Sequence, residues 1–156
     1  MKKFLVLGAS HLFALAIGFA VGIYVLPILT APDGPSVAEI KSAAGGAEYT
    51  AEFRRDLKGS DPLHWGEGVV SVSRKAVSLS GRVAPGPDYK LYLVPEFVDT
   101  KEAFTRLKER SLRVGDVKTF ENFIVELPDS ADITQYNTVV VWCEAFSQFI
   151  SAAKYR

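Results

Sequence analysis

Cys143 is the single cysteine in the 156-residue chain, and it ends an apolar run, VVVWC. A thiol can act as a redox group or a ligand, or it can fill a core as a small apolar side chain. Strand alternation places Cys143 on one face and Trp142 on the other, with valines as neighbours on both faces. This pattern predicts a central strand buried on both sides, and composition alone favours an inert core cysteine.

Two further side chains with useful chemistry stand in turn-rich segments. His64 lies in DPLHWGEG, where its imidazole could ligate a metal or haem and the glycines could let the backbone approach a flat cofactor. Asp88 lies in APGPDYKLYL, a rigid turn before an alternating strand, where it could cap the turn or contribute to a site. Composition alone favours plain surface turns for both segments.

Several familiar chemistries lack their residues in this sequence. A Walker A loop, GxGxxG, G-x-S-x-G, H-E-x-x-H and paired cysteines are all missing, so nucleotide binding, common hydrolase chemistry and a structural zinc are not indicated. The 18 basic and 18 acidic residues balance, which leaves no electrostatic footprint for nucleic acid. The sequence therefore predicts no nucleic-acid partner, and it favours a binding module or redox component over a stand-alone enzyme.

The elements that must position these side chains begin with an apolar N-terminus. Residues 4–29 carry no charge, and at about 1.5 Å per residue they form a helix of roughly 39 Å, longer than a hydrocarbon core of about 30 Å. A cleaved secretory signal is the alternative, but cleavage after Ala31 would put the unsuitable Leu29 at position −3. Residues 1–30 are predicted to be an uncleaved transmembrane signal anchor.

The charges and glycines of this segment suggest its orientation and pairing. Lys2 and Lys3 precede the span, so the positive-inside bias places the N-terminus in the cytoplasm. The rest of the chain is then periplasmic or extracellular, on the far side of the inner (plasma) membrane. Gly18 and Gly22 form a GxxxG motif through which two spans could pair as a homodimer.

Beyond residue 30 the sequence predicts a linker and one all-β domain. Residues 31–48 are rich in Pro and Gly, and the spacing of Ser36 and Glu39 is that of a capping box, which predicts a short helix to about Ala43. Residues 49–155 break into short apolar or alternating runs, the pattern of an antiparallel β-sandwich or barrel. The eight expected strands are 49–57, 68–73, 76–80, 89–95, 112–117, 122–127, 137–143 and 146–152.

One segment departs from the strand pattern. Asp99, followed by Glu102, is typical of a helix N-terminus, and the apolar side chains of residues 103, 104 and 107 fall on one helical face. The sequence therefore predicts one short helix over 99–110 lying across the sheet.

Three segments together resemble a known family. The His-x-Gly-x-Gly entry at 64–68, the Gly-Pro-Asp turn at 86–88 with its strand, and the strand ending Trp-Cys-x-x-Phe at 142–146 are similar to the DM-thirteen domain. This is the proposed electron-transfer module of Skeletor-type proteins, often found beside DOMON domains. The resemblance covers about residues 49–155. It implies a small all-β extracytoplasmic domain whose lone cysteine acts as a naked thiol or as a ligand to a prosthetic group such as haem.

The resemblance makes electron transfer or thiol redox chemistry the leading hypothesis, with Cys143 as the reactive or ligating residue. Asp88 matches the turn motif of the family and is expected to take part in cofactor binding. The resemblance implies that His64 assists as a second ligand or as a base. Haem or copper is the candidate cofactor, and a redox protein of the envelope is the expected partner. The expected pocket walls are Tyr92, Trp142, Phe146 and Phe149. A non-catalytic envelope binding or scaffold module with a buried structural Cys143 is the alternative, and an intermolecular disulfide is a third interpretation.

Overall fold

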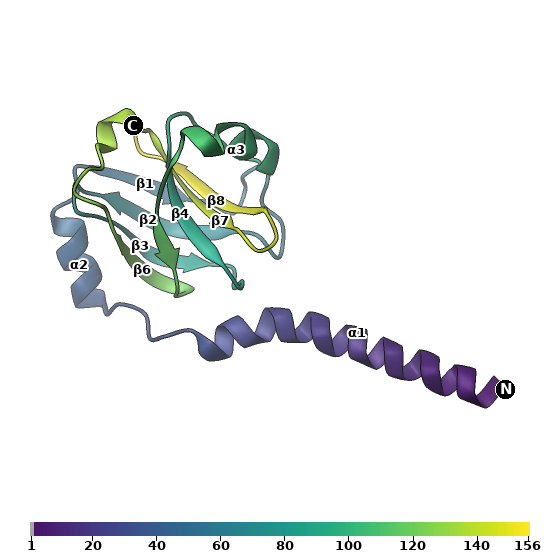
Figure 1. The fold of residues 1–156 in the computed structure, drawn as a ribbon. Helices are drawn as coiled ribbons and strands as arrows, with labels where there is room; N and C mark the ends of the chain where they lie inside the picture. Colours follow the sequence, from purple (N-terminus) through teal and green to yellow (C-terminus); the bar gives the residue numbers. More distant parts are fainter. Residues whose placement is uncertain (1) are drawn as a thin grey trace.

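Eight antiparallel strands form two four-stranded sheets in the computed structural model, which describes residues 2–156 (Figure 1). One sheet has the order β1-β2-β3-β6 and the other β5-β4-β7-β8. The strands are β1 Tyr49–Phe53, β2 Gly66–Val72, β3 Ala76–Val83, β4 Tyr89–Val94, β5 Leu112–Val117, β6 Glu121–Glu126, β7 Thr138–Cys143 and β8 Gln148–Lys154. The helices are α1 Lys2–Thr30, α2 Val37–Gly45 and α3 Lys101–Leu107, with 3₁₀ turns at Lys108–Arg110 and Ile133–Gln135.

The predicted β-sandwich is confirmed, and each of the eight expected strands has a counterpart. The largest differences are at strand ends. β1 stops at Phe53, whereas β3 continues beyond Ser80 because its pairing with β2 extends to Gly66 opposite Val83. The expected cap of the short helix was wrong: Thr100, not Asp99, caps α3, and its side chain accepts a hydrogen bond from the backbone N–H of Ala103 at 3.2 Å.

The N-terminal helix α1 leads away from the sandwich (Figure 1). It covers residues 2–30 of the predicted anchor, and all of its side chains are exposed or half-buried. By length and composition it is the one helix of residues 2–156 that could cross a membrane. An exposed apolar surface of this extent is unfavourable in water.

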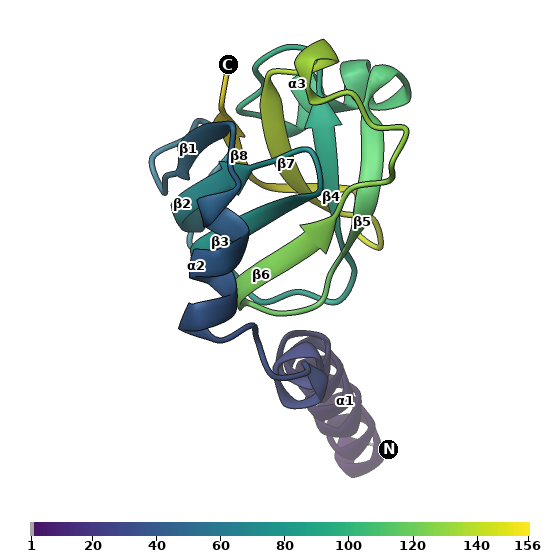
Figure 2. The same ribbon diagram turned by 90° about the vertical axis from the view of Figure 1, so that its left-hand side faces the viewer.

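The segment predicted as a linker contains α2, which packs onto the sandwich. The capping box is present as expected: Ser36 accepts from the backbone of Glu39, and the Glu39 carboxylate accepts from the backbone N–H of Ser36. The helix runs through Gly45, slightly further than predicted. Its buried Ile40 faces the sheet at β3 and β6, and Figure 2 shows α2 beside these strands.

Strand β7 is covered on both faces, as the alternation predicts. All six of its residues are buried. Val139, Val141 and Cys143 belong to the main core between the sheets, whereas Val140 and Trp142 belong to a second apolar cluster on the outer face. The second cluster is closed by Phe104 from α3 and by side chains of β4 and β8. Cys143 and Trp142 are therefore neighbours in sequence that face different cores.

Candidate functional site

Cys143 and His64 line one largely apolar cavity of about 330 Å³. Cys143 comes from the end of β7, opposite Tyr89 of β4 and Gln148 of β8, and is only 2% exposed. His64 comes from the turn before β2. The sandwich therefore brings the thiol and the imidazole to one cavity, although they are 79 positions apart in the chain.

Asp61 orients the imidazole. Its Oδ1 accepts hydrogen bonds from the backbone N–H groups of Leu63 and His64 at 2.7 and 2.9 Å, and its Oδ2 lies 2.8 Å from His64 Nδ1. With the proton assigned to Nδ1, both groups are satisfied and Nε2 is left with a free lone pair. This carboxylate–histidine pair is the arrangement that orients histidine ligands in metal sites.

The electrostatics of Asp61 agree with this role. Partial burial alone would raise its pKa, but hydrogen bonds from the His64 ring and from the backbone of Leu63 outweigh burial and lower the pKa. Sequence reasoning assigned no role to Asp61. The signal was available, because an aspartate that precedes a histidine by three positions in a Pro-containing turn can accept from that residue's backbone.

The glycines after His64 serve the sheet instead of a cofactor, which corrects the expectation that they admit a flat ring. A Cβ at Gly66 would lie 2.8 Å from Cβ of Ser151, so Gly66 lets β2 pass close to β8. Gly68 has a φ of +119°, and a Cβ there would meet the backbone of Ser80 on β3. Both glycines are required by backbone packing within the sandwich.

The surroundings of the Cys143 thiol favour its protonated form. Burial raises the thiol's pKa, and the charge of Asp88 acts in the same direction. Backbone groups of Phe146, Asp88 and Ala145 hydrogen-bond to the sulfur and only partly offset this effect. A free thiolate is therefore disfavoured at neutral pH, and the group suits a ligand that deprotonates on binding better than a free nucleophile.

We expect Cys143 to react at least about 100-fold more slowly with dithiobis-nitrobenzoate in the folded protein than after denaturation. The cause is the combination of a 2% exposed side chain and a raised pKa. The measurement is the rate of nitrothiobenzoate release at pH 7, with and without guanidinium. Equal rates in the two conditions would contradict a buried thiol. The same burial disfavours a disulfide between two folded copies, since their Cβ atoms could not approach to about 4 Å.

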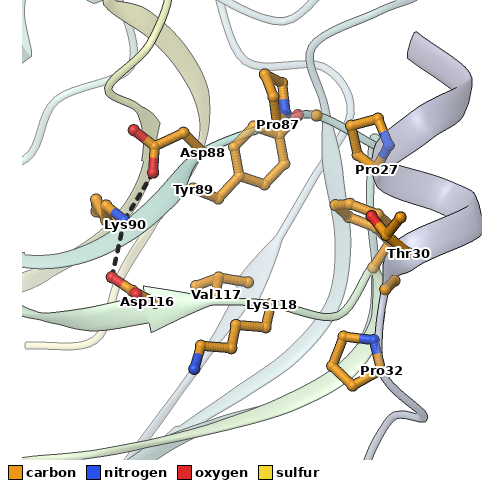
Figure 3. A pocket seen from close by; sticks show the side chains of 13 residues that line it. Pro27, Thr30, Pro32, Pro87, Asp88, Tyr89, Lys90, Asp116, Val117 and Lys118 are labelled. Atoms are coloured by element: carbon orange, nitrogen blue, oxygen red, sulfur yellow. Dashed lines mark ion pairs between the residues drawn. The ribbon is translucent and has the colours of Figure 1, made fainter. Parts of the chain in front are cut away.

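Asp88 does not line the Cys143 cavity. Its carboxylate pairs with Lys90 Nζ at 2.7 Å, and Lys90 also contacts Asp116 at 2.8 Å, as Figure 3 shows. Its backbone carbonyl accepts from the N–H of Glu144 at 2.9 Å, which joins the Gly-Pro-Asp turn to the end of β7. Asp88 therefore stabilises the turn that forms one side of the cavity, and its expected cofactor-binding role stays a prediction.

Trp142 does not line the cavity either, and neither do Tyr92 and Phe149. These three expected pocket walls lie in the second cluster, on the opposite face of β7 from the thiol. Phe146 does line the cavity, together with Pro85, Pro87 and Ile150. In the Trp-Cys-x-x-Phe motif, the Trp142 indole therefore packs in the second cluster, whereas the Cys143 thiol and the Phe146 ring line the cavity.

The cavity offers few protein ligands. Within residues 2–156 no group of three or more His, Cys, Asp or Glu side chains could hold a metal ion. A copper centre usually takes three or more protein donors, whereas haem iron needs one or two axial ligands from the protein. Cys143 and His64 therefore suit a group that brings most of its own ligands.

Comparison with protein families gives one match. Residues 52–155 match a family described as "Electron transfer DM13". The match takes in strands β2 to β8 completely and the last two residues of β1, and it includes both Cys143 and His64. Neither the curated proteins nor the solved structures gave a match.

Proposed function

Because the chain belongs to the electron-transfer DM13 family, as its sequence motifs predict, we propose that it is a membrane-tethered, extracytoplasmic electron-transfer module that works through Cys143. The main support is the cavity that Cys143 shares with His64, whose ring is oriented by Asp61. When bound there, a haem or related redox group would supply one-electron chemistry.

The residues of the chain provide binding and orientation in this proposal. Cys143 supplies a soft sulfur ligand and His64 supplies Nε2, with Asp61 holding the ring in one tautomer. Apolar walls from Leu63, Phe146 and Ile150 keep water away from the group. The volume of about 330 Å³ is at the lower end for small-molecule sites, so part of a large ring would extend through the open side.

The proposed location follows from the N-terminal helix. α1 could cross a membrane, and Lys2 and Lys3 at its start favour a cytoplasmic N-terminus. The sandwich would then lie outside the cytoplasm, where electrons reach it from a partner protein of the envelope or from the membrane. One cysteine cannot form a disulfide within the chain, so the proposal assigns the protein electron transfer through a bound group instead of dithiol exchange.

The test is a haem titration of the full-length chain in detergent micelles, followed by the absorption spectrum. We expect the wild-type protein to bind haem with a shifted Soret band, and Cys143→Ser and His64→Ala to weaken binding at least about tenfold. Asp61→Asn, which loses the orienting carboxylate, should weaken it by about tenfold. The matched control is Trp142→Phe, because this neighbour of Cys143 faces the other core and should bind normally.

Two results would contradict the proposal. One is a wild-type protein that takes up neither haem nor Cu²⁺ in a parallel titration. The other is haem uptake that Cys143→Ser and His64→Ala leave unchanged while circular dichroism shows both variants folded. Either result would favour the alternative function, a non-catalytic envelope binding module, which the burial of the Cys143 thiol also supports.

A further inference from the structure

Two large apolar side chains stand exposed at the mouth of the Cys143 cavity. Leu63 is 58% exposed and Phe146 is 53% exposed, and both line the cavity. Leu63 belongs to the turn before β2, and Phe146 belongs to the turn between β7 and β8. Two turns that are distant in sequence thus present apolar tips side by side, an arrangement that is unfavourable against water and typical of a binding surface.

The same cavity has a third wall from the N-terminal helix. Ile23 and Tyr24 of α1 line it together with residues of the two turns. Figure 3 shows the neighbouring contact, where Pro27 and Thr30 of α1 face Pro87 and Tyr89 of the sandwich. In Figure 1 the turn between β7 and β8 lies on the side of the domain that α1 runs past.

The position of Tyr24 along α1 indicates how deep in a bilayer the α1 side of the cavity would lie. A helix crosses a hydrocarbon core of about 30 Å with roughly 20 residues, so a span that starts at Phe4 ends near Ile23. Tyr24 then falls at the headgroup level, where tyrosine is enriched. With the span placed in this way, Leu63 and Phe146, which share a cavity with Tyr24, would be at the level of the bilayer surface.

The charges beside the two turns do not oppose this placement. Asp61 is paired with His64, and Asp88 is paired with Lys90. Glu144, next to the β7–β8 turn, lies 2.5 Å from Lys108 Nζ. Each of these carboxylates has a cationic or hydrogen-bonding partner, so the apolar tips can enter the interface without exposing an uncompensated acid to anionic lipid.

We propose that Leu63 and Phe146 insert into the interfacial layer of the bilayer that α1 crosses, so that the sandwich rests on the membrane surface and the Cys143 cavity opens at headgroup depth. The occupant of this apolar surface is the lipid bilayer. The inference rests on the membrane anchoring in the proposed function and extends it: the domain is docked, not suspended on a tether. A redox group or electron carrier dissolved in the membrane could then reach the cavity without crossing water.

The test uses the full-length chain with Cys143→Ser as background and one new cysteine per variant, labelled with a fluorophore and reconstituted into phosphatidylcholine vesicles. Doxyl groups on the lipid acyl chains then quench labels that enter the bilayer. We expect L63C and F146C to be quenched at least threefold more than F97C. Phe97 is a matched control because it is 46% exposed but follows the C-terminal end of β4, whereas the cavity is lined by residues at the N-terminal end of that strand. G22C, within the span, reports the anchoring itself.

The outcomes separate the two proposals. Quenching at position 22 with only the F97C level at 63 and 146 would overturn the docking and leave the anchoring intact. Absence of quenching at position 22 would overturn both. Amide hydrogen exchange of the unsubstituted chain gives an independent measurement that does not need the Cys143→Ser background. Docking predicts slower exchange of the turns at 61–64 and 144–147 in vesicles than in detergent, and equal exchange would contradict it.

Discussion

Replacement of Gly68 by valine is expected to lower the free energy of unfolding by about 4 kcal/mol. The backbone of Gly68 has a φ of +119°, a conformation that costs a side-chain-bearing residue about 1–3 kcal/mol. A Cβ would also lie 2.6 Å from Cα of Gly81 and would clash with the Ser80 carbonyl across the β2–β3 pair. Moving β2 and β3 apart to relieve this overlap costs about a further 1–3 kcal/mol of unfolding free energy.

The measurement is chemical denaturation of the full-length chain in a mild detergent, followed by far-ultraviolet circular dichroism. The matched control is Gly45→Ala, because a Cβ at that position meets nothing within 4 Å. Its effect should stay within about 0.5 kcal/mol. A Gly68→Val variant as stable as this control would show that β2 can relax at Gly68, and it would remove the backbone explanation for the glycine in the His-x-Gly-x-Gly segment.

Truncation of Trp142 to alanine is the second large expected effect, a loss of about 3–5 kcal/mol in unfolding free energy. The indole is 2% exposed and packs against Phe104 with ring centroids 4.8 Å apart. Lys108 Nζ lies 5.5 Å from the Trp142 ring centroid, which adds a cation–π contact. Removal of the ring leaves a cavity between β7 and α3 that the surrounding side chains cannot fill.

Chemical denaturation of Trp142→Ala, again in detergent, checks this value. Phe97→Ala provides the control for loss of an aromatic ring, since Phe97 is 46% exposed and its truncation should cost less than about 0.5 kcal/mol. A loss below 1 kcal/mol for Trp142→Ala would contradict a structural role in the second cluster. The tryptophan of the Trp-Cys-x-x-Phe motif would then need another explanation, such as contact with a bound group.

The strand ending at Cys143 shows how far the sequence alone leads. Alternation of valines around Trp142 and Cys143 was enough to predict a strand covered on both faces, and the structure confirms it. The same alternation places the indole and the thiol on opposite faces, so Trp142 could not share a pocket with Cys143. The expected walls Tyr92 and Phe149 fail for a different reason: which face of a strand meets which layer depends on strand order, and that order is a tertiary property.

The histidine shows the opposite case. His64 was selected from its residue type in a turn-rich segment and then from a family resemblance. The cavity that it shares with Cys143 arises only from the folding of two distant turns onto one end of the sandwich. Asp61 was missed although its position three residues before His64 in a Pro-containing turn is a sequence signal for such a side-chain hydrogen bond. Asp88 was expected at the site because it lies in a family motif, but its carboxylate is taken by Lys90.

Local rules determined the elements of this protein from its sequence. The length of the apolar run determined a helix that could span a membrane, the Ser36–Glu39 spacing determined a capped helix, and period-two alternation determined the strands. These features depend on neighbours within a few residues. Which strands pair, which face holds the thiol, and which turns and helix end surround it depend on packing between segments as far apart as Tyr24 and Phe146. Only the tertiary structure decided those, because burial of apolar surface is optimised over the whole chain.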